Sequence, residues 1–94
     1  MGRLVHIRRR QEGERYVLYY FTDYVPPIRK LCDPISECVE GFVEIDKTAR
    51  TVRIKECSPG LEESPKRWII ECVMMMAKKA LSKSEYPGIL DFQS

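Results

Sequence analysis

The 94-residue chain has no asparagine and only two glutamines, although 32% of its residues are charged. Scarce thermolabile amides and abundant charge are typical of proteins from hyperthermophiles. The composition therefore predicts a protein from a thermophile. Because 44% of the residues are hydrophobic and low-complexity runs are missing, we expect residues 1–94 to form a single packed domain.

Long apolar segments are also missing. The longest apolar stretch, residues 68–77, contains Glu71 and is too short to cross a bilayer. The basic first ten residues are not followed by an apolar run of signal-peptide length. We therefore expect a cytoplasmic protein that does not interact with a membrane.

Enzyme motifs do not occur in the sequence. The five glycines are isolated, so no glycine-rich phosphate loop is expected, and the signatures H-E-x-x-H and G-x-S-x-G are missing. The only histidine, His6, has neither a cysteine nucleophile nor an orienting carboxylate that the sequence places beside it. These observations predict a protein that is not an enzyme, with no cofactor and no small-molecule substrate.

The chain contains four cysteines, but none of their gaps has the two to four residues typical of a zinc site, so no metal is expected. Disulfides are rare inside cells except in thermophiles. A disulfide between Cys32 and either Cys38 or Cys57 is therefore one alternative. Cys72, in an apolar segment, is expected to be a small buried residue.

Two runs of β-branched and aromatic residues, 4–10 and 15–21, flank a short polar segment and predict a β-hairpin. If Arg10 pairs with Arg15, one hairpin face is mainly apolar and the other mainly basic. The basic face would then carry His6, Arg8, Arg10, Arg15, Val17 and Tyr19.

The rest of the chain completes an α+β plan. Prolines make residues 22–37 a long connection, and residues 38–46 and 51–57 alternate as a second hairpin, in which Glu44 is expected opposite Arg53. Ser64 and Pro65 are suited to begin a helix that runs to about residue 84. The expected fold is a four-stranded antiparallel sheet of two hairpins with the C-terminal helix packed on one face. A small curled β-barrel with a C-terminal helix is the alternative.

The basic hairpin face is the strongest functional candidate. Residues 1–30 hold seven Arg and Lys against three acids, whereas residues 31–63 hold four against eight. Arginines bind phosphates, and an exposed aromatic ring among them can stack on an unpaired base. Alternatively, the acidic middle third neutralises these arginines within the fold. The predicted nucleic-acid-binding residues are Arg3, His6, Arg8, Arg10, Arg15 and Tyr19.

The helix predicts a second contact surface, because it is apolar around most of its circumference. Met74, Met75 and Met76 are consecutive, and successive helical residues are 100° apart, so at least one must point away from the core. A neighbouring subunit or the tail at residues 87–92 would provide cover. The predicted partner-interface residues are Ile70, Met74, Met75 and Phe92. The sequence thus predicts a self-associating, non-enzymatic binding module for nucleic acid, or alternatively a protein-interaction subunit of a larger assembly.

Overall fold

A computed structural model of the chain describes residues 4–23 and 39–93. Its elements, in chain order, are β1 (Leu4–Glu12), β2 (Tyr16–Thr22), β3 (Glu40–Asp46), β4 (Thr51–Cys57), the 3-10 turns η3 (Leu61–Glu63) and η4 (Pro65–Arg67), helix α1 (Trp68–Lys83) and β5 (Phe92–Gln93). The strands form one antiparallel sheet in the order β4-β3-β2-β1-β5. The α+β plan of two hairpins followed by a helix is confirmed.

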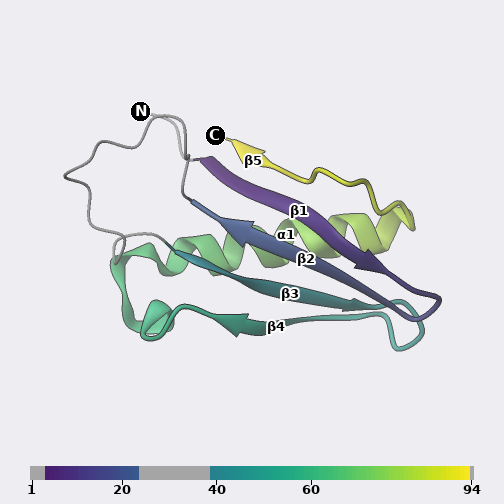
Figure 1. Cartoon of the computed structure of the whole chain (residues 1–94), viewed down its shortest axis with the longest axis horizontal. Coiled ribbons are helices and arrows are strands. Elements are labelled where there is room, and N and C mark those ends of the chain that lie inside the picture. The colour runs from purple at the N-terminus through teal and green to yellow at the C-terminus, as the bar shows by residue number, and fades with distance from the viewer. Residues whose placement is uncertain (1–3, 24–38, 94) are drawn as a thin grey trace.

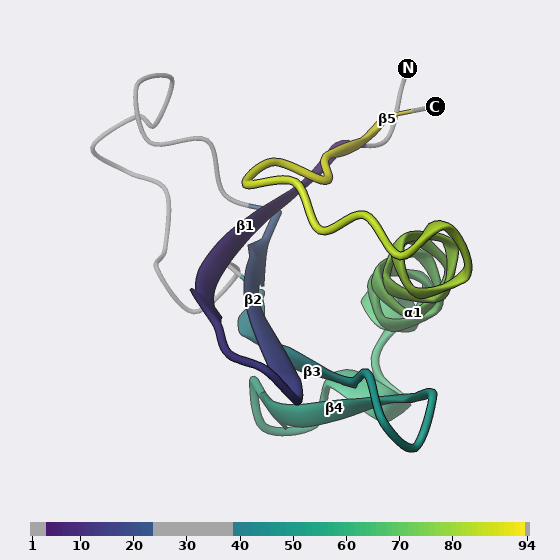
Figure 2. The ribbon, with the colours of Figure 1, turned by 90° about the vertical axis from the view of Figure 1, so that its right-hand side faces the viewer.

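The sheet is strongly curved, and α1 lies against its inner face (Figures 1 and 2). β4 and β5 form the two edges, so the sheet is open and the barrel alternative is wrong. Helix and tail both lie on the inner side in Figure 2. We call the opposite side of β1 to β4 the outer face, and no element among residues 4–23 and 39–93 covers it.

The core fills the space between the inner face and α1. Alternate strand residues point inward, as the two-residue period of a strand requires. The helix contributes residues spaced three or four apart, which form a stripe along one side. The fully or almost fully buried residues include Val5, Ile7, Val17, Tyr19, Phe21, Val43, Ile45, Ile69, Val73, Ala77, Ala80 and Leu81.

The register of the first hairpin differs from the predicted one. Arg9 pairs with Tyr19, and the register shifts between Arg9 and Gln11, so that Arg10 lies in a β-bulge. The turn is also tighter than expected, since the Gly13 amide donates a 2.8 Å hydrogen bond to the Tyr16 carbonyl. In the register that pairs Arg9 with Tyr19, position 10 would lie opposite Leu18. The predicted pairing of Arg10 with Arg15 is therefore wrong by three positions.

An odd register error moves every side chain of one strand to the other face. Val17, Tyr19 and Phe21 therefore point inward, whereas Tyr16, Leu18 and Tyr20 point outward. The second hairpin shows the predicted register, with Glu44 opposite Arg53.

The C-terminal tail forms a fifth strand that the sequence did not predict. Phe92 pairs with Val5, and the Leu90 amide donates a 2.9 Å hydrogen bond to the Ile7 carbonyl. The Asp91 carboxylate accepts a 3.0 Å hydrogen bond from the Ile7 amide. The tail thus covers the exposed edge of β1, which would otherwise offer unpaired backbone groups to another chain.

Helix α1 begins three residues later than predicted. Ser64 does act as a cap, but its hydroxyl accepts the Lys66 amide at the start of the 3-10 turn η4. None of the helices in the described part of the chain is long and apolar enough to cross a membrane.

Candidate functional site

The outer face is the candidate functional surface, because the described elements leave it open. β2 places Tyr16, Leu18 and Tyr20 along its centre, and Phe42 of β3 pairs directly with Tyr20. Large aromatic side chains on a solvent-facing sheet are well placed to contact a ligand.

Two arginine–tyrosine contacts lie on this face. The guanidinium carbon of Arg10 is 5.5 Å from the centroid of the Tyr20 ring, and that of Arg15 is 5.1 Å from the centroid of Tyr16. Both distances are within the range of cation–π attraction. Tyr16 and Tyr20 are four positions apart on one strand, or roughly 13 Å at 3.3 Å per residue. The face therefore carries two separate stacking positions.

Two further contacts hold the side chain of Tyr20 in place. Its ring centroid is 5.6 Å from that of Phe42, with the planes tilted by 59°. Its hydroxyl donates a 2.9 Å hydrogen bond to Glu40 Oε2. Partial burial and this hydrogen bond raise the pKa of Tyr20, so the ring remains neutral at physiological pH.

Two of the predicted arginines are neutralised within the fold. Arg8 and the Nδ1 atom of His6 both contact the carboxylate of Asp91, the latter at 3.5 Å. Arg15 lies 3.2 Å from Asp46. Neutralisation by the acidic middle third, the alternative interpretation of the charge pattern, therefore applies to Arg15, whereas Arg8 is neutralised by the C-terminal tail.

The carboxylate of Asp91 is held in its ionised form. Partial burial opposes its charge, but the hydrogen bond from the Ile7 amide and the guanidinium of Arg8 outweigh that effect and lower the pKa of Asp91. Arg8 is consequently held in an ion pair with Asp91 of the tail and is not a cation available to a ligand.

Arg10 is the predicted arginine that remains available. It has no carboxylate partner among residues 4–23 and 39–93, and it is exposed. Its position in the bulge directs it over Tyr20. Arg3, the remaining arginine of the predicted set, lies outside the described residues.

β4 supplies two further cations that sequence reasoning did not select. Arg53 and Lys55 share a single carboxylate, that of Glu44, at 3.0 and 3.9 Å. One positive charge is therefore left uncompensated. The sequence analysis passed over both residues as ligand-binding cations because they belong to the acidic middle third of the chain.

The outer face is hollowed at both ends. A hollow of about 280 Å³ near the hairpin turns is lined partly by Arg15, Tyr16, Leu18 and Lys55. A second, of about 330 Å³, lies at the opposite end beside Tyr20 and Phe42. These depressions give the face the relief that an extended ligand requires.

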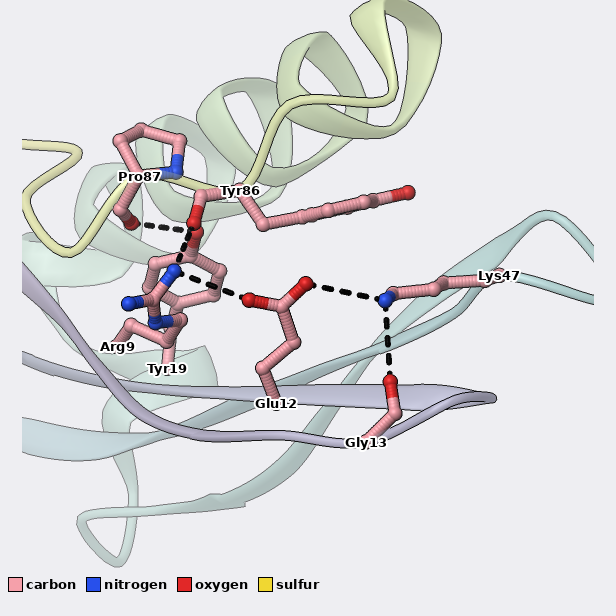
Figure 3. Close-up of polar contacts among 7 residues, drawn as sticks. All are labelled: Arg9, Glu12, Gly13, Tyr19, Lys47, Tyr86 and Pro87. Atoms are coloured by element: carbon pink, nitrogen blue, oxygen red, sulfur yellow. Dashed lines mark hydrogen bonds and ion pairs between the residues drawn. The ribbon is translucent and has the colours of Figure 1, made fainter.

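Tyr19 is not part of this surface. Its side chain is 0% exposed, and its hydroxyl donates a 2.7 Å hydrogen bond to the Pro87 carbonyl (Figure 3). Burial raises the pKa of Tyr19 to about 12. The predicted stacking of a base on Tyr19 is therefore wrong, and the reason is the odd register error described above.

A polar cluster around Tyr19 ties the tail to both hairpin turns (Figure 3). Arg9 donates hydrogen bonds to Glu12 and to the Tyr86 carbonyl. Lys47, from the turn between β3 and β4, donates to Glu12 at 3.1 Å and lies 4.9 Å from the Tyr86 ring centroid. Because every group has a partner within the cluster, we interpret it as a structural lock for the tail.

The predicted partner interface is mostly part of the core packing. Ile70, Met74 and Phe92 are half-buried against the core, whereas Met75 is 49% exposed. The expectation that at least one of the three methionines points away from the core is confirmed. The tail covers part of the core through Leu90 and Phe92, whereas Ile89 is 61% exposed.

Cys57 has a free thiol, so the predicted disulfide between Cys32 and Cys57 is not formed. The alternative disulfide between Cys32 and Cys38 lies outside the described residues.

Comparison of the chain with protein-family models, with curated proteins and with solved structures finds no match in any of the three. The function must therefore be argued from the geometry of the outer face.

Proposed function

We propose that this protein is a non-enzymatic binding module that captures single-stranded nucleic acid on the outer face of its sheet. The observation that carries the proposal is the pair of arginine–tyrosine contacts, Arg10 with Tyr20 and Arg15 with Tyr16, on an open face. Aromatic rings and guanidinium planes are the groups on which unpaired bases stack.

Stacking supplies most of the affinity in this account. Each base stacked on an aromatic side chain contributes about 1–3 kcal/mol. Bases within a duplex are stacked on each other and cannot present their faces to Tyr16 or Tyr20. We therefore expect single strands to bind more tightly than duplexes, with little dependence on sequence.

The electrostatic contribution is smaller than the sequence suggested. Arg10 and one of the two cations that share Glu44 are the uncompensated positive charges beside the rings. About two phosphates would be neutralised, which corresponds to a salt slope of roughly −1.4 for a single strand.

A charge-matched pair of variants tests this assignment. Arg10→Gln with Lys55→Gln removes two cations from the outer face and should weaken binding of a labelled single-stranded RNA at low salt by about tenfold. Lys78→Gln with Lys79→Gln removes two exposed cations from α1 and should leave binding unchanged. Equal losses in the two variants would show that only net charge matters and would contradict a site on the outer face.

A protein contact is the second candidate, favoured by the exposure of Met75 and Ile89. We propose that this contact, if made, joins copies of the chain or joins it to a larger assembly. Sedimentation equilibrium of the wild type and of Met75→Gln with Ile89→Gln tests it. A monomeric wild type would contradict the proposed self-association.

We also propose the cytoplasm as the compartment in which the protein acts. The free thiol of Cys57 supports this, because reducing conditions inside cells keep thiols unpaired.

A further inference from the structure

The hollow at the end of the outer face away from the hairpin turns has a different chemistry from the rest of that face. It has a volume of about 330 Å³ and lies where β4 leads towards η3. Two aromatic rings, Tyr20 and Phe42, and two carboxylates, Glu40 and Glu56, line it. Among the residues that the structure describes, its lining contains no lysine or arginine.

The two carboxylates are charged and available. Glu40 and Glu56 are exposed, and neither has an ion-pair partner among residues 4–23 and 39–93. The hydroxyl of Tyr20 donates to Oε2 of Glu40 and so holds this carboxylate beside the ring. A carboxylate held next to aromatic faces is a favourable position for a cation.

Glu40 and Phe42 project from β3 on the side of the hollow, and Gly41 lies between them. A Cβ added at Gly41 would point to the inner face, where it would lie 2.6 Å from the buried Phe21 ring. On the outer side, therefore, Gly41 presents only backbone to the hollow, between the side chains of Glu40 and Phe42.

Tyr20 already attracts a cation of the chain itself. The guanidinium of Arg10 lies over this ring, 5.5 Å from its centroid. The ring is therefore positioned to interact with a cation even without the help of Phe42 and the two carboxylates.

We propose that this hollow binds an organic cation, an ammonium or guanidinium group of the size of a lysine or arginine side chain. Its volume is at the lower end of the range for small-ligand sites, about 300–1,000 Å³. An organic cation fits better than a metal ion, because the two aromatic rings favour a cation–π contact and no group of three metal-binding side chains occurs among the described residues.

This inference goes beyond the proposed nucleic-acid function and does not depend on it. The carboxylates of Glu40 and Glu56 repel phosphates, so the phosphates of a bound strand would lie beside Arg10 and Lys55 and away from the two carboxylates. The organic cation and a base of the strand would then compete for the ring of Tyr20.

The test is a ¹⁵N–¹H correlation NMR titration of the full chain with L-arginine methyl ester. Saturable shifts are expected at the backbone amides of Gly41, Phe42 and Cys57, and sodium chloride at equal ionic strength should not reproduce them. A capped Gly-Arg-Gly peptide, titrated in parallel, distinguishes a free amine from an arginine presented by a polypeptide. Tighter binding of the ester indicates the first source, and equal or tighter binding of the peptide indicates the second.

Two matched variants locate the site. Glu40→Gln with Glu56→Gln should weaken the interaction at least tenfold while the dispersed spectrum shows an intact fold. Glu62→Gln with Glu63→Gln removes two exposed carboxylates from η3 and should leave the interaction unchanged. Shifts that fail to saturate, or equal losses in both variants, would overturn the proposal.

Arg10→Gln separates this proposal from the nucleic-acid function. The variant frees the ring of Tyr20, so the affinity for the arginine ester should be unchanged or higher, whereas the affinity for single-stranded RNA should fall. A loss of ester binding in Arg10→Gln would contradict the cation site and leave the nucleic-acid proposal standing.

Discussion

Arg10 lies over the ring of Tyr20, with its guanidinium carbon 5.5 Å from the ring centroid. The contact exists because a β-bulge removes Arg10 from the regular pairing of β1 and β2. In regular pairing, adjacent positions alternate between the two faces, and Arg10 would have a partner on β2. At the bulge, Arg10 instead lies close to the outward-facing Tyr20 and has no carboxylate partner in the part of the chain that the structure describes.

Stacking on the outer face should depend on the tyrosine rings and not on their hydroxyls. Replacing both Tyr16 and Tyr20 by Leu removes the rings and should weaken single-stranded RNA binding by about 1–3 kcal/mol for each base stacked. Fluorescence anisotropy gives the dissociation constants, and thermal unfolding checks the fold. Tyr20→Phe keeps the ring and should bind as the wild type does. A large loss in Tyr20→Phe would assign the effect to the hydrogen bond with Glu40 instead.

The buried hydroxyl of Tyr19 should stabilise the fold by holding the tail. Tyr19→Phe removes the 2.7 Å hydrogen bond to the Pro87 carbonyl, and the free energy of unfolding should fall by about 1 kcal/mol. Urea denaturation measures this change. Tyr16→Phe is the control, because Tyr16 is 43% exposed and an exposed hydroxyl contributes little. Equal stability of the two variants would contradict the role of Tyr19 as part of the tail lock.

Gly41 should tolerate no side chain. In Gly41→Ala the new Cβ would lie 2.6 Å from the Phe21 ring and would also meet the backbone of Glu56. Overpacking of this kind typically costs about 1–3 kcal/mol of stability. Gly88→Ala is the matched control, since a Cβ there has nothing within 4 Å, and its stability should be close to that of the wild type. Comparable denaturation midpoints for both variants would show that β3 and β4 are less tightly packed than described.

The contacts of Asp91 predict how stability depends on pH. Its pKa in the folded state is lowered from the ordinary value of 3.8. The stabilisation is therefore fully present above about pH 4–5, where the unfolded chain is also ionised, and it is lost as the pH falls through the lowered pKa. In Asp91→Asn, the free energy of unfolding should fall less steeply between about pH 5 and pH 2 than it does in the wild type. The pKa of Asp46 is also lowered, so the free energy of unfolding of that variant should still fall to some extent as the pH decreases. Parallel pH profiles would show that Asp91 does not hold the tail.

The sequence predicted the elements with strong periodicity and missed those without it. Residues 51–57 alternate between apolar and polar, so the second hairpin and its register were predictable. The bulge at Arg10 has no such signature, and it reversed the faces assigned to Tyr19 and Tyr20. β5 has only two residues, too few for a periodic pattern.

The candidate site was predictable only in part, because its charges are balanced by residues distant in sequence. Arg8 and its partner Asp91 are 83 positions apart, and Arg15 and Asp46 are 31 apart. No local pattern reveals such pairs. The prediction of a basic strand therefore indicated the hairpin that borders the outer face, but it overestimated the number of arginines without a carboxylate partner among the described residues.

Titration of a labelled single-stranded RNA with the purified protein at several salt concentrations, followed by fluorescence anisotropy, tests the central claim most directly. The account predicts a dissociation constant of about 1–100 µM at low salt and a slope of roughly −1.4 against log salt. It also predicts weaker binding of the corresponding duplex. The absence of binding at low salt, or tighter binding of the duplex, would contradict a single-strand site on the outer face.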